Sequence, residues 1–184
     1  MRIAGPLILA LAVLPGAPAL AAPPVPAQPP TTVAPVTVFP NAPKLVSTWP
    51  AAGQAVSPGV LILTLKFDQP MQARGFDIAP AAGAAAPNCL KTPRLLNDGR
   101  TFVLLCTVAP QQTYGLAFNG GPADAKGGFA NIGDQRAAPA TLSFTTNGGD
   151  GPRDIRAAMK AQGLTDLDSP IQDSPPMAPE KPLP

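Results

Sequence analysis

The chain's clearest pattern is an alternation of apolar and polar positions over residues 61–68, which read LILTLKFD. Leu61 and every second residue to Phe67 are apolar, and the intervening positions end in Lys66 and Asp68. A period of two predicts a half-buried β-strand over residues 60–68. Pro70 ends this strand because proline has no amide proton for a sheet ladder.

Shorter segments of the same kind follow one another along the chain, separated by turn residues. They span residues 45–49, 75–78, 93–96, 101–108, 113–119 and 140–146. The Asn97-Asp98-Gly99 run predicts a hairpin turn because Asp-Gly tolerates positive φ. About seven short strands without a helical period predict an all-β fold, an Ig-like or fibronectin-type antiparallel β-sandwich. A small barrel is the competing architecture.

A short helix is predicted after the last strand, over residues 152–162 (PRDIRAAMKAQ). Pro152 suits a first helical turn and Gly163 a C-terminal stop. One face would carry a narrow apolar stripe: Ile155, Ala158, Met159 and Gln162. An isolated helix of this length is marginal in water. It would therefore pack weakly on the sandwich or fray, and docking of a partner is an alternative.

The N-terminus, residues 1–21, has the features of a secretory signal peptide. Arg2 gives a positive start, residues 7–14 are apolar, and residues 19–21 form a small-x-small cleavage pattern. The apolar run is shorter than the roughly 20 residues of a membrane helix. We therefore expect cleavage near Ala22, no membrane span in the mature chain, and a periplasmic or secreted location. An uncleaved N-terminal anchor is the alternative.

Two proline-rich segments flank the predicted domain. Residues 22–43 predict an extended linker and residues 169–184 a disordered tail, because such compositions bury too little apolar surface to fold. Between them, residues 44–147 suffice for one sandwich of ~100 residues. Residues 148–168 would form the short helix and a linker.

The only two cysteines, Cys89 and Cys106, predict a disulfide, because an even count in an exported chain favours oxidation. The turn at Asp98-Gly99 would fold the chain back and bring Cys89 to the inward face of the strand that holds Cys106. Closing this loop would stabilise the fold by roughly 3 kcal/mol on a chain-entropy model. A redox pair would instead favour a Cys-x-x-Cys spacing at a helix start.

Candidate catalytic chemistry is scarce. The chain has no histidine, which excludes Ser-His-Asp and Cys-His catalysis and histidine-based zinc sites. No two acidic residues have a spacing that suggests an acid/base pair. Asp98 is explained by its turn, and Asp68 by a strand end. We expect no catalytic residue, no cofactor and no metal site, hence no enzyme. A net charge of +2 with scattered basic residues also argues against nucleic-acid binding.

One loop and two aromatic residues admit a second interpretation. Asp124, Asn131 and Asp134 in a glycine-rich loop could offer oxygens to calcium, but the spacing and the glutamate of a calcium loop are lacking, which favours a solvated loop. Trp49 and Tyr114 are single aromatics at strand positions, and we expect core or edge roles before sugar stacking.

Several segments together carry a family resemblance. They are residues 43–58 (PKLVSTWPAAGQAVSP), 63–71 (LTLKFDQPM), 113–118 (TYGLAF), a Gly-Gly loop, and 142–146 (LSFTT). This order resembles the bacterial Ig-like domains first described in surface-layer proteins, the SbsA-type family. Asp68 stands where serine is common, residues 124–128 match the family's D-x-x-G-N loop only loosely, and the cysteine pair lies outside its pattern.

The resemblance implies a non-enzymatic structural or protein-binding module of the bacterial cell envelope. Its partners would be envelope or surface proteins, and no catalytic residues are shared across the family. The opening segment also resembles periplasmic copper-resistance carriers, but their histidines are missing here. A copper- or calcium-binding carrier of sandwich fold is therefore the alternative, and a histidine-free hydrolase is the third. Ligand-binding residues and the oligomeric state are not predicted.

Overall fold

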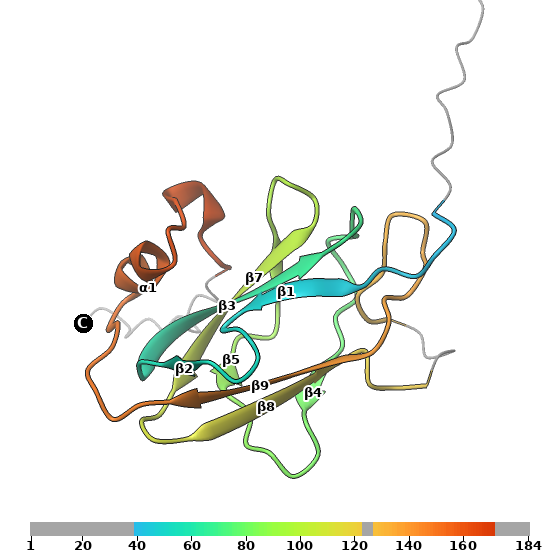
Figure 1. Cartoon of the computed structure of the whole chain (residues 1–184). Helices are drawn as coiled ribbons and strands as arrows, with labels where there is room; N and C mark the ends of the chain where they lie inside the picture. Colours follow the sequence, from blue (N-terminus) through green and yellow to red (C-terminus); the bar gives the residue numbers. More distant parts are fainter. Residues whose placement is uncertain (1–38, 123–126, 172–184) are drawn as a thin grey trace, which may run out of the picture. The chain divides into compact units, whose positions relative to one another are not determined.

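Two β-sheets face each other across a shared apolar core (Figure 1). The computed structural model describes residues 39–122 and 127–171. Sheet A contains β1 (Leu45–Trp49), β3 (Gly59–Phe67), β5 (Asn88–Cys89), β6 (Arg94–Leu95) and β7 (Thr101–Val108). Sheet B contains β2 (Ala55–Val56), β4 (Ile78–Pro80), β8 (Thr113–Phe118) and β9 (Ala140–Thr146). The predicted fold class, an all-β Ig-like sandwich, is confirmed.

The pair β3–β7 forms the centre of sheet A. The two strands are antiparallel, with Leu61 opposite Cys106, Leu63 opposite Leu104 and Leu65 opposite Phe102. These side chains are all buried in the main core. The alternation in the sequence therefore gives the inward face of β3 correctly, since every second side chain of a strand points to the same side of the sheet.

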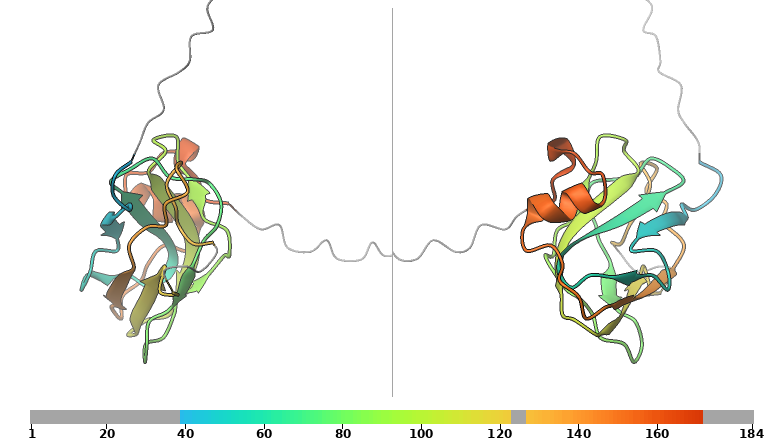
Figure 2. Two further views of the ribbon diagram at one scale, coloured as in Figure 1. Left: turned by 90° about the vertical axis from the view of Figure 1, so that its right-hand side faces the viewer. Right: turned by 60° about the vertical axis from the view of Figure 1, so that its left-hand side comes forward.

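The opposite face of the same pair is also buried, which differs from the half-buried strand expected. Ile62 and Val103 are both fully buried in a second, smaller core together with Ala158 and Met159. These last two residues belong to α1 (Ile155–Ala161), which lies across the outer face of sheet A (Figure 2). An apolar residue on the polar side of an alternating strand is thus explained by a helix that covers it.

Helix α1 begins three residues later than Pro152, because Asp154 caps it. The Asp154 carboxylate accepts a hydrogen bond from the N–H of Ala157 at 2.8 Å. Gly163 ends the helix with φ of +69°, as predicted. The side chain of Gln162 donates to the carbonyl of Ile62 at 2.8 Å and so joins the helix end to β3. The predicted apolar stripe therefore packs on the sandwich.

Sheet B departs from the expected all-antiparallel pattern at one edge. Strands β8 and β9 are antiparallel, with Tyr114 opposite Phe144. Strand β2 instead pairs in parallel with β9, and Ala55 lies opposite Thr145. After β1 the chain crosses from sheet A to sheet B through a turn at Gly53, which has φ of +75°. Every other pair of strands is antiparallel, as predicted, and β2, a two-residue strand that the sequence did not single out, adds this one parallel pair at the edge.

The strand boundaries follow the sequence closely where strands are long. β1, β7 and β9 have the predicted bounds, while β3, β6 and β8 differ by one residue at one or both ends. β4 lies at Ile78–Pro80 and not over residues 75–78, and the two-residue strands β2 and β5 were not predicted. A short 3-10 helix, η1 (Asp166–Asp168), follows α1.

Several predictions concern residues that the structure does not describe. The leader (1–21), residues 22–38 of the linker, and residues 172–184 of the tail lie outside the described ranges. Among the described helices, neither has the length and apolar character needed to traverse a bilayer.

Candidate functional site

A disulfide joins the edge of sheet A to its centre. Cys89 of β5 and Cys106 of β7 lie directly opposite each other in the ladder, with their Cα atoms 3.9 Å apart. Cys106 points into the core and is 1% exposed, whereas Cys89 is only partly buried. The predicted Cys89–Cys106 pairing is confirmed, and the bond fixes the short edge strand β5 onto the sheet.

The hairpin between β6 and β7 brings the first cysteine back to the second. Asp98 forms its turn by accepting hydrogen bonds from the backbone N–H groups of Arg100 and Thr101, both at 2.9 Å. The hydroxyl of Thr101 donates to the other carboxylate oxygen at 2.6 Å. Partial burial alone would raise the pKa of Asp98, but these three hydrogen bonds outweigh it and lower the pKa below its ordinary value. Asp98 is a turn residue, as predicted.

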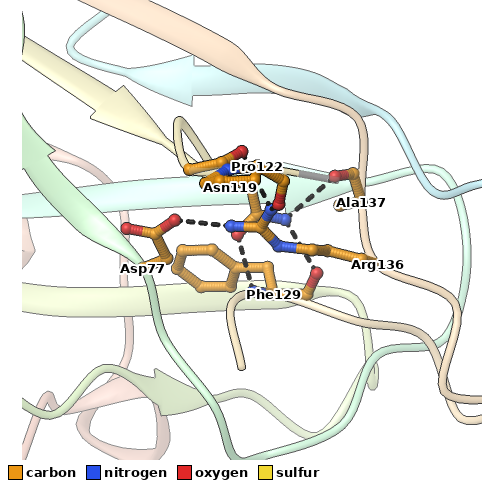
Figure 3. A network of polar contacts seen from close by, with 7 residues as sticks. Asp77, Asn119, Pro122, Phe129, Arg136 and Ala137 are labelled. Carbon is orange, nitrogen blue, oxygen red and sulfur yellow. Dashed lines mark hydrogen bonds and ion pairs between the residues drawn. The ribbon is translucent and has the colours of Figure 1, made fainter. Parts of the chain in front are cut away.

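A second polar cluster lies at the end of β8, where Asn119 is 1% exposed (Figure 3). Its amide nitrogen donates to the carbonyls of Phe129 and Ala137, both at 2.9 Å. Its carbonyl oxygen accepts from the N–H of Phe129, also at 2.9 Å. One buried side chain therefore satisfies three backbone groups from two distant loop positions.

Arg136 extends this cluster toward the surface (Figure 3). Its guanidinium donates to the carbonyl of Pro122 at 2.7 Å and to that of Gly121 at 3.2 Å. It also forms an ion pair with Asp77 at 2.6 Å, in which the arginine side chain is 15% exposed and the aspartate 32%. Arg136 thus ties the chain after β8 to the segment that precedes β4.

Gly128 lets the backbone pass close to both side chains. It has φ of +90°, and an added Cβ would lie 2.5 Å from Oδ1 of Asn119 and 2.8 Å from Nε of Arg136. No other residue fits at this position without displacing the cluster.

The cluster places Phe129 in the core. Its ring centroid lies 5.0 Å from that of Phe102, 5.4 Å from Phe67 and 5.7 Å from Phe76. Such separations are typical of favourable aromatic pairs. The loop after β8 therefore supplies a central side chain of the sandwich and is part of its core.

The loop considered for calcium is organised by Asn131, which is fully buried. Its side-chain oxygen accepts from the N–H groups of Gly133 and Gln135, and its nitrogen donates to Gln69 and Gln135. Asp134 instead accepts from Gln72 at 2.6 Å, at the surface. The third candidate, Asp124, lies outside the described residues. Within residues 39–122 and 127–171, no three His, Cys, Asp or Glu side chains gather in a way that could hold a metal ion.

The two single aromatic residues lie in the sandwich, as predicted. Tyr114 is 6% exposed, stacks on Phe144 with 5.4 Å between ring centroids, and accepts a hydrogen bond from the N–H of Ala109 at 2.7 Å. Trp49 is partly buried against the main core at the end of β1. The ring of Tyr114 therefore forms no open platform for a sugar.

Sequence reasoning did not single out Asn119 or Arg136. Arg136 counted only as one of the scattered basic residues, and Asn119 only as the end of a strand. A usable signal was the Gly127-Gly128 pair just before Phe129, which indicates a backbone that approaches other groups closely before an apolar side chain.

Comparisons with known proteins give little further information. No family model matches the chain, and no curated protein matches it. Among solved structures it is similar to domains 1–6 of the surface layer protein SbsC, with a TM-score of 0.40 and 16% identity over 59% of this chain and 14% of that chain. A likeness of this degree assigns neither family nor function. Membership of the SbsA-type family stays a prediction.

Proposed function

We propose that this protein is an exported, non-enzymatic Ig-like β-sandwich that serves as a structural or protein-binding module of the bacterial cell envelope. The observation that carries the proposal is how the clustered polar side chains are used. Asp98, Asn119 and Asn131 each direct their oxygens to backbone N–H groups of turns and loops. These groups hold loops in place, and none is oriented as a nucleophile with an adjacent base.

The disulfide supports the proposed location. Bonds of this kind persist in oxidising compartments and are rare in the bacterial cytoplasm. Cys89 and Cys106 are the only cysteines of the chain, so the chain offers no third thiol with which this disulfide could exchange. Together with the signal-peptide pattern of residues 1–21, the bond favours the periplasm or the cell exterior.

Export is tested by expressing the chain with and without residues 2–21 in a bacterium with a periplasm. We expect the complete chain to be cleaved near Ala22, to fractionate with the envelope or the medium, and to resist alkylation until it is reduced. The leaderless control should stay in the cytoplasm with both thiols reactive. An uncleaved cytoplasmic product of the complete chain would contradict the proposal.

The module's role is tested on the purified mature chain. We expect no turnover of ester or glycan substrates, and in living cells we expect site-specific crosslinks from exposed Val46 to envelope proteins. Hydrolysis that survives repurification would favour the hydrolase. Stoichiometric retention of copper or calcium in equilibrium dialysis would favour the carrier. Either result would overturn the structural assignment.

A further inference from the structure

A cavity of about 380 Å³ opens between the edge strands β4 and β5, which Figure 1 labels. These strands end sheets B and A on the side away from β1 and β2. Leu104 of β7 and Leu116 of β8 line its inner part, and Phe76 and Ile78 line the side of β4. The volume falls within the ~300–1,000 Å³ typical of small-molecule sites.

The cavity exists because the chain leaves the sheet between β5 and β6. Cys89 pairs with Cys106, but Arg94 pairs with Val103, so that residues 90–93 lie opposite only two residues of β7. The extra residues form a bulge, so that no edge-strand residue pairs with Leu104 in the ladder. The disulfide holds β5 on one side of this bulge, and the hairpin at Asp98 holds β6 on the other. The gap therefore cannot close by a shift of register.

The lining combines apolar side chains and exposed polar backbone atoms with one positive charge. Every lining side chain is apolar except that of Lys91, which belongs to the bulge and is exposed. An apolar wall favours an alkyl chain because burial removes it from water. The ammonium group of Lys91 favours a carboxylate at the opening. Both properties occur together in a small anionic amphiphile.

We propose that this cavity binds a small amphiphile with an alkyl chain and a carboxylate head, of the medium-chain fatty-acid class. The alkyl chain lies against Leu104 and Leu116, and the carboxylate meets Lys91. The site is independent of the role proposed above, since a structural module and a protein-binding module could both carry it.

The binding test uses titration calorimetry on the oxidised mature chain with octanoate, decanoate and dodecanoate. We expect saturable one-to-one binding that tightens roughly fourfold per added methylene until the cavity is filled. Decanol, which has the same chain without the charge, should bind roughly fivefold more weakly than decanoate, as expected for an exposed ion pair. Unsaturable uptake, or equal affinity for decanol and decanoate, would overturn the proposal.

Three variants locate the site. Ile78→Trp fills the cavity from β4 and should abolish binding without lowering the melting temperature of the sandwich. Ala86→Trp fills the cavity from the exposed loop, and it replaces Ile78→Trp in the binding test if that variant does not fold. Lys91→Ala should weaken decanoate roughly fivefold and leave decanol unchanged, whereas Lys160→Ala on α1, outside the lining, is the matched control. Binding that survives both tryptophan variants would place the amphiphile elsewhere and overturn the proposal.

A truncation after Ile171 identifies a competing occupant. If decanoate binds equally well to the mature chain and to the truncated one, the cavity is open to the amphiphile, as proposed. If binding occurs only after residues 172–184 are removed, the chain's own end occupies the cavity, and the proposal fails.

Discussion

Asp98 and Asn119 perform the same task in two different settings. Each is a short polar side chain beside the end of a strand, and each makes three hydrogen bonds that hold a loop. The partners of Asp98, Arg100 and Thr101, lie two and three residues away, and Asp98 itself is exposed. Those of Asn119 lie ten and eighteen residues away, and Asn119 itself is almost completely buried.

The difference shows that burial decides how much the same number of hydrogen bonds contributes to the stability of the fold. When a surface hydrogen bond is lost, water replaces the missing partner, and the net cost is small. When a buried one is lost, the abandoned carbonyl or N–H has no replacement and retains its full desolvation penalty. The cluster at Asn119 should therefore matter far more to stability than the turn at Asp98.

The largest effect is expected from Asn119→Ala. It leaves the N–H of Phe129 and the carbonyl of Ala137 without partners in the core, while the carbonyl of Phe129 keeps only the bond from the N–H of Ala137. We expect a loss of about 3 kcal/mol in the free energy of unfolding. Chemical denaturation of the oxidised protein measures it. Asn97→Ala, an exposed change in the Asp98 turn, is the matched control. A cost similar to that of the control would break the comparison.

An intermediate effect is expected from Arg136→Met. This change removes the ion pair with Asp77 and the hydrogen bonds to the carbonyls of Gly121 and Pro122, while it keeps most of the side chain's volume. Since the cluster is partly exposed here, we expect a loss of about 1–2 kcal/mol. A double-mutant cycle with Asp77→Asn isolates the ion pair. Strict additivity of the two changes would show that the pair contributes nothing of its own.

A smaller effect is expected from Asp98→Ala, about 1 kcal/mol, because Asp98 and Arg100 are exposed and water can solvate the N–H group of Arg100 once the carboxylate is gone. Thermal denaturation at neutral pH measures the change. The disulfide should still form, since β5 also pairs with β7. If Asp98→Ala destabilised the protein as strongly as Asn119→Ala, burial would not be the deciding variable.

The smallest effect concerns acid. The pKa of Asp98 is lowered in the folded protein, so the unfolded chain takes up the proton first as the pH falls. The stability that Asp98 contributes is present above its ordinary pKa of 3.8 and is lost as the pH falls through the lowered value. Asp98→Asn should therefore flatten the decline of stability below about pH 4. An unchanged decline in Asp98→Asn would contradict this contribution of the carboxylate.

The same contrast explains what the sequence could predict. The Asp98 turn was predictable because Asn-Asp-Gly and the apolar strand after it, residues 101–108, are contiguous. The disulfide was predictable from the even number of cysteines in a chain with a signal-peptide pattern, and this turn made the pairing geometrically possible. The Gly127-Gly128 pair indicates a close backbone approach, but it does not identify Asn119, whose partners are backbone groups far along the chain.

The remaining differences between the predicted and the observed structure depend on short elements and on contacts between distant parts of the chain. Ile62 occupies a position that alternation assigns to solvent, and only the packing of α1 makes it a core residue. Strand β5 escaped prediction because two residues preceded by Pro87 have no period to detect. The cavity beside Leu104 depends on a mismatch between two pairings, which no local pattern encodes.

The parallel pairing of β2 with β9 has a mechanical consequence. The rungs between the two strands include bonds from Gly53 to Ser143, from Thr145 to Gln54 and from Asn147 to Val56, at 2.8–2.9 Å. Tension applied before β2 and after β9 pulls parallel neighbours in opposite directions, so that these rungs are sheared together and cannot be unzipped singly. The seam where the chain changes sheet would act as a clamp that resists stretching.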